Sequence, residues 1–162
     1  MPTIDASAFV APNASVVGDV VIGANSTIWY GATMRGDVNI IRIGANTNIQ
    51  DGTVIHVSTG GQGTHIGDNV TVGHLAMLHD CTLETDAYVG MTACVMDGAV
   101  VEGKAFVAAG ALVTPGKRVP AGQLWAGRPA KYLRDLTEDD YKMMAWSGPH
   151  YVRLGQDHKN SQ

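Results

Sequence analysis

An aliphatic residue recurs at every sixth position through most of this chain, with three short interruptions. The period fits neither an α-helix, whose faces repeat about every 3.6 residues, nor an isolated strand, whose faces alternate. The recurring residues are Ile4, Val10, Val16, Ile22, Ile28 and Met34, then Ile43, Ile49 and Ile55, then Ile66, Val72 and Leu78, and finally Leu83, Val89, Val95, Val101, Val107, Val113 and Val119.

A second signal accompanies the first. A small or β-branched residue stands four positions after nearly all of these aliphatic residues, as at Ala8, Thr47, Ala76 and Ala105. The two signals predict a triangular prism in which each hexad supplies one short strand and one corner, and three hexads complete a coil. The aliphatic side chains point inward, the small residues fit the corners, and the coils stack about 4.8 Å apart as parallel ladders.

The period fades after Val119, where prolines interrupt regular strand pairing. We therefore expect an all-β fold with a C-terminal helix in a single domain. Residues 1–124 would form the prism, and residues 125–162 would form an exit turn and a helical tail packed along its outside.

The helical tail has a clear start in Thr137–Asp140, which has the spacing of a capping box. We expect a helix from there to about Trp146, an interruption at Gly148–Pro149, and then a second helical piece. The last residues, from about Asp157, are expected to fray. The apolar face of the helix would comprise Met143, Met144 and Trp146.

Composition excludes several classes of function. The 162 residues carry a net charge of −4 without a Lys/Arg cluster, which argues against nucleic-acid binding. The start of the chain does not resemble a signal peptide, and no apolar run approaches the roughly 18 residues of a membrane span. Cys81 and Cys94 have neither metal-type spacing nor the density of a disulfide framework, so we expect structural thiols and a cytoplasmic location.

The histidines can be placed once the faces of the prism are numbered. We assign three successive hexads to faces one, two and three. An inserted loop containing residues 62–65 follows, and the next three hexads occupy the same faces one coil higher. The aliphatic residues that define this register are Ile43 and Ile66 on face one, Ile49 and Val72 on face two, and Ile55 and Leu78 on face three.

Two histidines stack on face three in this register. His56 follows Ile55 and His79 follows Leu78, so both point outward, about one strand spacing apart. Two imidazoles at that separation can share one metal ion at roughly 2.0–2.1 Å from each.

His74 lies on a different face, two positions after Val72 on face two. It cannot easily join the histidine pair of its own chain, but the same residue of a neighbouring subunit can. Three such contacts close a threefold ring. The register therefore predicts a homotrimer in which each metal site takes two histidines from one subunit and one from the next.

Further polar residues fall near these histidines. Arg35 lies below His56 on face three, and Asp51 occupies the hexad position of His74 one coil lower, with Gln50 beside it. These residues could belong to a functional site at an interface. Alternatively, Arg35, Asp37 and Asp51 could form a purely structural network of ion pairs between subunits.

Four further residues are weaker candidates, and two of them, His65 and Tyr151, have two interpretations each. His65 could carry protons near the site or be an ordinary loop residue. Tyr151 could reach back from the tail towards the metal or simply pack. His150 and His158 lie in the tail, and we expect His158 to be solvated.

Once these residues are placed, the chain resembles the γ-carbonic anhydrase family, within the hexapeptide-repeat proteins, and specifically a subgroup with a short loop. The motifs that carry the resemblance are Met34–Asp37, Ile43–Gly52, His56, Val72–His79, Met96–Gly98, Val113–Gly116 and Trp125–Tyr132. The resemblance implies a left-handed prism. It maps the family's zinc ligands onto His56, His74 and His79, and its interface residues onto Arg35, Asp37, Gln50 and Asp51.

The implied activity is reversible hydration of carbon dioxide to bicarbonate by a metal-bound hydroxide at the trimer interface. Gln50 would orient the bound water or bicarbonate, while Arg35 and Asp51 would hold the interface. Imidazole ligands would also suit iron or cobalt in place of zinc. The chain departs from the family prototype between Val57 and Gly73, where the glutamate that serves as proton shuttle is absent.

Two other functions stay open. Related hexapeptide proteins act on acyl-CoA as acyltransferases or thioesterases, although such an enzyme would need one catalytic histidine rather than three. The chain could also be a metal-binding scaffold with little or no catalysis.

Overall fold

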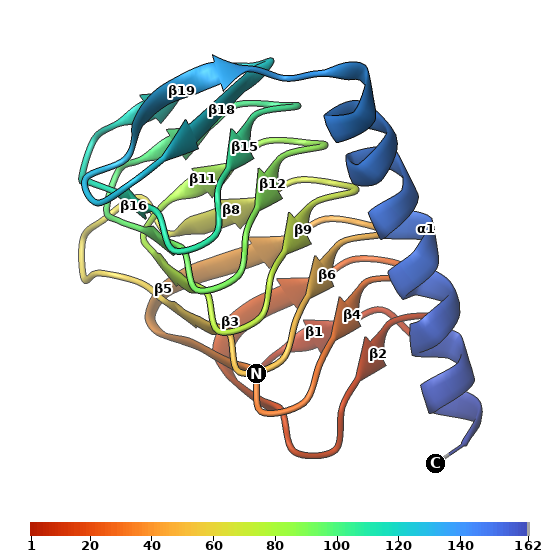
Figure 1. Cartoon of the computed structure of the whole chain (residues 1–162). Coiled ribbons are helices and arrows are strands. Elements are labelled where there is room, and N and C mark those ends of the chain that lie inside the picture. The colour runs from red at the N-terminus through yellow and green to blue at the C-terminus, as the bar shows by residue number, and fades with distance from the viewer. Residues whose placement is uncertain (162) are drawn as a thin grey trace.

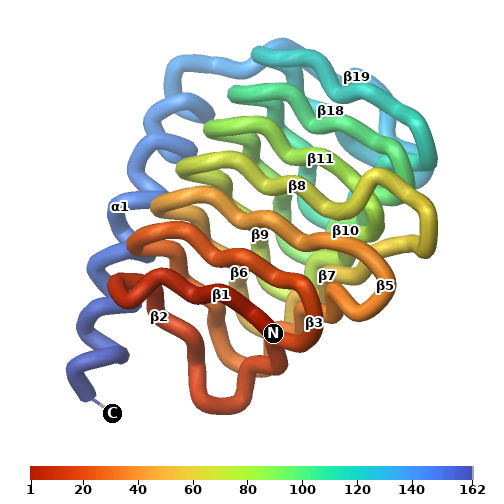
Figure 2. Tube along the Cα trace, turned by 180° about the vertical axis from the view of Figure 1, so that it is seen from behind, coloured from red at the N-terminus to blue at the C-terminus, as the bar shows by residue number. Residues whose placement is uncertain are grey.

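The computed structural model describes residues 1–161, which form a triangular parallel β-helix with one long α-helix along its side (Figure 1). The coils wind in the left-handed sense, as the resemblance implied. Seen from behind, the coils stack regularly from the N-terminal end to the C-terminal hairpin (Figure 2). The architecture predicted from the hexad period is therefore confirmed.

Face two is a ladder of short strands that lies beneath the helix. Its members pair in parallel, each with the strand one coil above. They are β2 (Phe9–Val10), β4 (Thr27–Ile28), β6 (Asn48–Ile49), β9 (Thr71–Val72), β12 (Tyr88–Val89), β15 (Phe106–Val107) and β18 (Gln123–Ala126).

Faces three and one are joined by two long strands that pass round the corner between them, β3 (Ser15–Ile22) and β5 (Thr33–Ile43). Face three continues upward with β7 (Val54–His56), β10 (Met77–His79), β13 (Cys94–Val95) and β16 (Leu112–Val113). Face one contains β1 (Thr3–Ile4), β8 (Thr64–Ile66), β11 (Thr82–Leu83), β14 (Val100–Val101) and β17 (Arg118–Val119).

The predicted register is confirmed on all three faces. Ile43 pairs with Ile66, Ile49 with Val72, and Ile55 with Leu78. The inserted loop was expected to contain residues 62–65, and this is partly wrong. Thr64 and His65 already pair with β5, so the loop comprises residues 57–63.

The inward-facing aliphatic residues form one continuous core, and most of them are fully buried. Ile4 is the clear exception at 42% exposed, because the first coil has no coil beneath it. Gly44 shows why glycine often follows the inward residue: a Cβ there would lie 2.7 Å from the Gly67 carbonyl carbon of the next coil.

An antiparallel hairpin closes the upper end of the prism. It joins β18 to β19 (Lys131–Asp135), and its turn contains a cis peptide bond at Arg128–Pro129. The expected boundary between residues 124 and 125 falls within β18, which still pairs with β15.

The tail is a single helix, α1 (Glu138–Asn160), which begins with the predicted capping box of Thr137 and Asp140. The predicted interruption at Gly148–Pro149 is wrong, since the helix continues past Pro149. Packing against the prism accounts for this. The Ser147 hydroxyl lies 2.9 Å from that of Thr71, and Gly155 lies against Thr27.

The predicted fraying from Asp157 and the solvated His158 are also wrong. The Tyr30 hydroxyl lies 2.8 Å from His158 Nδ1, and the Lys159 ammonium donates to the carbonyls of Ala6 and Ala8. Trp146 was expected on the apolar face, but it is exposed and stacks on His150. Among residues 1–161, no helix is long and apolar enough to cross a membrane.

Candidate metal centre

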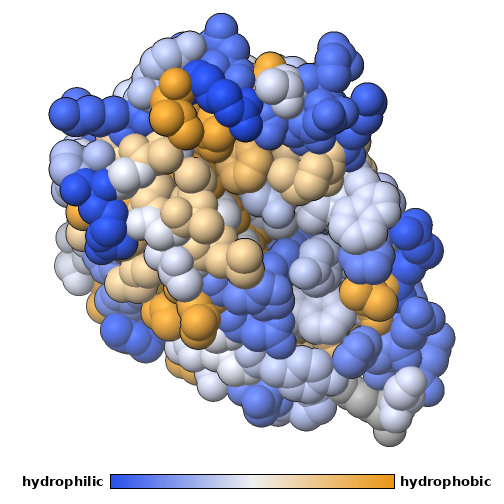
Figure 3. All heavy atoms as spheres, viewed as in Figure 1, coloured by the Kyte–Doolittle hydropathy of each residue, from blue (hydrophilic) through white to orange (hydrophobic). Residues whose placement is uncertain are grey.

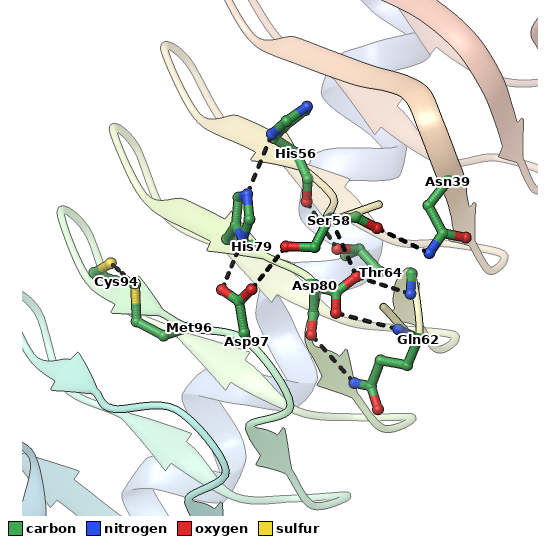
Figure 4. A network of polar contacts seen from close by, with 11 residues as sticks. Asn39, His56, Ser58, Gln62, Thr64, His79, Asp80, Cys94, Met96 and Asp97 are labelled. Atoms are coloured by element: carbon green, nitrogen blue, oxygen red, sulfur yellow. Dashed lines mark hydrogen bonds and ion pairs between the residues drawn. The ribbon is translucent and has the colours of Figure 1, made fainter. Parts of the chain in front are cut away.

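His56 and His79 lie side by side at the ends of β7 and β10 (Figure 4). Their Cα atoms pair directly in the ladder, and His56 Nδ1 lies 3.2 Å from His79 Nε2. Parallel pairing brings the two rings together because each follows an inward-facing residue of face three. The predicted histidine pair is therefore present in the fold.

A carboxylate lies at the other nitrogen of each ring. His56 Nε2 is 3.2 Å from Asp37 Oδ1, and His79 Nδ1 is 2.7 Å from Asp97 Oδ1. The Arg35 guanidinium beside Asp37 lowers the pKa of that carboxyl group. Burial opposes ionisation of Asp97, but hydrogen bonds from His79 and Ser58 outweigh it and lower the pKa of Asp97. Both groups are therefore acceptors at neutral pH.

This arrangement suits a cation between the rings. Because an ionised carboxylate only accepts, each ring directs an N–H outward, and a neutral ring then keeps a lone pair on the nitrogen that faces the other ring. Two lone pairs 3.2 Å apart repel each other unless a positive charge lies between them. Nitrogens bound to one tetrahedral zinc at about 2.0–2.1 Å lie roughly 3.3 Å apart, so the observed separation fits a zinc ion.

His74 repeats the same pattern at the corner between β9 and β10. Its Nδ1 lies 2.9 Å from Asp51 Oδ2, and its side chain is 40% exposed. Within one chain, residues 1–161 contain no group of three or more His, Cys, Asp or Glu side chains placed to hold a metal. His74 therefore stands apart from the histidine pair, as the register predicted.

The other predicted site residues surround these histidines. Arg35 pairs with His56 in the ladder, and its Nη1 lies 2.5 Å from Asp37 Oδ2. Gln50 is buried, and its amide nitrogen donates to Asn48 Oδ1 at 3.0 Å. This bond fixes the orientation of the Gln50 amide and directs its remaining oxygen away from Asn48.

Tyr151 and His65 make other contacts within the chain. The Tyr151 ring packs edge-on against Trp29, with centroids 5.6 Å apart, and burial raises the pKa of Tyr151. His65 lies on face one and contacts the Gln62 carbonyl through Nε2. These contacts favour the packing interpretation of Tyr151, and they make His65 a residue of β8 rather than of the inserted loop.

Asp97 is a site residue that the sequence reasoning did not single out. It follows Met96, which lies one coil above His79 on face three, and its carboxylate reaches down to His79 (Figure 4). The same register that located His79 could have identified Asp97, because the two lie on consecutive coils.

The chain is similar to known proteins in sequence. Residues 1–36 match the family described as bacterial transferase hexapeptide (six repeats). The chain is 52% identical over 162 residues to the mitochondrial gamma carbonic anhydrase 2 of Arabidopsis thaliana, which covers 97% of this chain and 58% of that protein. The chain thus spans less than two thirds of that relative.

Two solved structures match over nearly their whole length. A hexapeptide transferase family protein from Anaplasma phagocytophilum is 49% identical with a TM-score of 0.93, covering 96% of this chain and 92% of that one. A Bacillus cereus protein provisionally described as an acetyltransferase is 42% identical with a TM-score of 0.97, covering 99% of this chain and 93% of that one.

Proposed function

Because the chain belongs to the hexapeptide-repeat family and has γ-carbonic anhydrases among its relatives, we propose that it catalyses the metal-dependent reversible hydration of carbon dioxide to bicarbonate. The observation that carries the proposal is the pairing of His56 and His79. Their facing nitrogens lie 3.2 Å apart, and their outer nitrogens each contact a carboxylate. Such carboxylate partners are typical of histidines that bind a metal.

The third ligand in this proposal is His74 of a neighbouring subunit in a homotrimer. Its Nδ1 contacts Asp51, which leaves Nε2 for the metal. Apolar residues near these histidines support an interface, because Val54, Met77, Leu75 and Met91 are between 38% and 64% exposed in the single chain. Figure 3 shows a broad apolar area over the coils on the side away from α1.

Zinc is the metal we propose, with iron or cobalt as alternatives that the same ligands accept. When bound, such a metal supplies a Lewis acid that lowers the pKa of water towards 7. Asp37, Asp97 and Asp51 hold the histidines in the tautomer that binds metal. Gln50, oriented by Asn48, would offer its amide oxygen to a bound water or bicarbonate.

Acyl transfer is the second candidate, favoured by the provisional description of the similar Bacillus cereus protein. An acyltransferase would use one histidine as a general base and would not need a convergent set with a carboxylate behind each ring. The arrangement of all three histidines therefore supports metal-dependent hydration over acyl transfer.

The test is to measure metal content and carbon dioxide hydration for the purified protein, a His79→Ala variant and a His150→Ala control. We expect one metal ion per subunit in the parent and the control, and loss of both metal and hydration in His79→Ala. A metal-free parent protein would refute the proposal. Bound metal without hydration would favour the scaffold, and turnover of acetyl-CoA that survives in His79→Ala would favour acyl transfer.

A further inference from the structure

The loop of residues 57–63, between β7 and β8, folds around the carboxylate of Asp80. Asp80 is 4% exposed and directly follows His79. Its side chain accepts backbone hydrogen bonds from Ser58 at 3.4 Å, Gln62 at 3.1 Å and Gly63 at 2.9 Å. The loop is therefore held in one conformation by the buried side chain of Asp80, which directly follows His79 in the sequence.

Close packing reinforces this conformation. A Cβ at Gly61 would lie 2.2 Å from the Asp80 carboxylate, so the loop lies directly against that group. Asn39 donates to the Ser58 carbonyl at 3.1 Å and to the Gly61 carbonyl at 2.8 Å. The loop thus places Ser58 in a defined position beside face three (Figure 4).

Ser58 connects the loop to the histidine pair through Asp97. The Ser58 hydroxyl donates to Asp97 Oδ2 at 2.8 Å, while the other oxygen, Oδ1, accepts from His79 Nδ1 at 2.7 Å. One carboxylate is therefore held at both oxygens, by the loop on one side and by a candidate ligand on the other.

We propose that Asp97 is a positioning residue that fixes the tautomer and ring orientation of His79, and that the 57–63 loop fixes Asp97 through Ser58. The inference rests on the proposed metal site. Asp97 requires the His79 proton on Nδ1, so Nε2 carries the lone pair that faces His56. Without Asp97, the ring can rotate and exchange tautomers, and part of the population presents an N–H to the metal.

The experiment measures zinc affinity by competition with a chromophoric chelator on metal-stripped full-length protein. Second-shell carboxylates typically contribute about 10–100-fold to metal affinity, so we expect a loss of that size in Asp97→Ala and a smaller one in Asp97→Asn, whose amide oxygen can still accept. We expect Ser58→Ala to lose less than about tenfold and Ser58→Thr to match the parent, since threonine keeps the hydroxyl. Asp157→Asn removes an exposed carboxylate on α1 as a charge-matched control.

Coupling between the two residues separates positioning from general destabilisation. If Ser58 acts through Asp97, Ser58→Ala should cause no further loss of affinity in the Asp97→Ala background. Nitrogen NMR of labelled histidine in the metal-free protein should show His79 protonated at Nδ1 in the parent and as a tautomer mixture in Asp97→Ala. Should Asp97→Ala fail to fold, the zinc affinities of Ser58→Ala and Ser58→Thr still test whether the Ser58 hydroxyl supports the site.

The outcomes distinguish this inference from the proposed function. A parent protein that binds zinc, together with Asp97 and Ser58 variants of unchanged affinity, would overturn the positioning role and leave the metal site intact. Additive losses in the double variant would also overturn it. A parent protein that binds no zinc would overturn both proposals.

Discussion

Asp51 and His74 occupy the same position in consecutive coils, and the Asp51 carboxylate lies 2.9 Å from His74 Nδ1. The contact leaves Nε2 of His74 free to bind a metal outside its own chain. The proposed site between subunits has a consequence that mixed trimers can test, because in that proposal each interface takes the histidine pair from one subunit and His74 from the next.

We predict that His74→Ala and His79→Ala proteins are each inactive alone but regain activity when co-expressed. In a mixed trimer, one interface joins an intact His56–His79 pair to an intact His74, so about one site in three is restored. Hydration assays of doubly tagged, co-purified trimers would measure this. Mixed trimers as inactive as the His74→Ala or the His79→Ala protein alone would contradict the shared site.

Acid should weaken the start of α1. The Arg134 guanidinium, followed by the hydrogen bonds from Thr137, holds the pKa of Asp140 far below its usual value. Since the folded-state pKa is depressed, the contribution to stability is complete above about pH 4 and is lost as the pH falls towards the folded-state pKa.

We therefore expect Asp140→Ala to lower the free energy of unfolding by about 1 kcal/mol at pH 7, with the difference shrinking below about pH 4. Thermal melts across that range would measure it. Asp139→Ala is the control, because the Asp139 side chain is 91% exposed. A difference from the parent that stays constant down to pH 2 would contradict the linkage.

The hexad register, with the inserted loop allowed for, explains why the histidine pair could be located from the sequence. With one hexad per face, counting from Ile55 to Leu78 predicts that His56 and His79 are neighbours, and the ladder confirms it. The register also places Asp97 on the coil above His79, but its contacts with His79 and Ser58 depend on a side-chain rotamer and on a loop that no period describes.

The tail was less predictable because tertiary packing overrides local preference there. Gly148–Pro149 predicts a break in the helix. Contacts of Ser147 and Gly155 with face two nevertheless stabilise one continuous helix through Pro149. His158 likewise gives no local signal of burial, and its partner Tyr30 lies 128 residues away.

Two glycines of α1 make a matched test of that packing. A Cβ at Gly155 would lie 2.3 Å from the Thr27 methyl group and 3.3 Å from the Phe9 Cβ, whereas a Cβ at Gly148 would have its nearest neighbour at 3.7 Å. Alanine favours a helix over glycine by about 1 kcal/mol, so the two substitutions should differ in sign.

We predict that Gly148→Ala stabilises the protein by up to about 1 kcal/mol. Gly155→Ala should destabilise it by about 1–3 kcal/mol through overpacking against the buried Thr27. Chemical denaturation of both variants beside the parent would measure the difference. Equal effects from the two alanines would show that α1 does not dock as tightly as the contacts indicate.

Substitution of Tyr151 can separate its two interpretations, packing against the prism and proton transfer at the metal site. Its ring packs against Trp29 at the edge of a small aromatic cluster. Tyr151→Phe keeps the ring, so we expect unchanged stability and a hydration rate within about twofold of the parent. Tyr151→Ala removes a half-buried ring and should cost about 2 kcal/mol of stability. Stopped-flow hydration and denaturation, measured on both variants, separate the two interpretations. A Tyr151→Phe protein of normal stability whose kcat falls tenfold would instead assign the hydroxyl to proton transfer, across a subunit interface if the trimer forms.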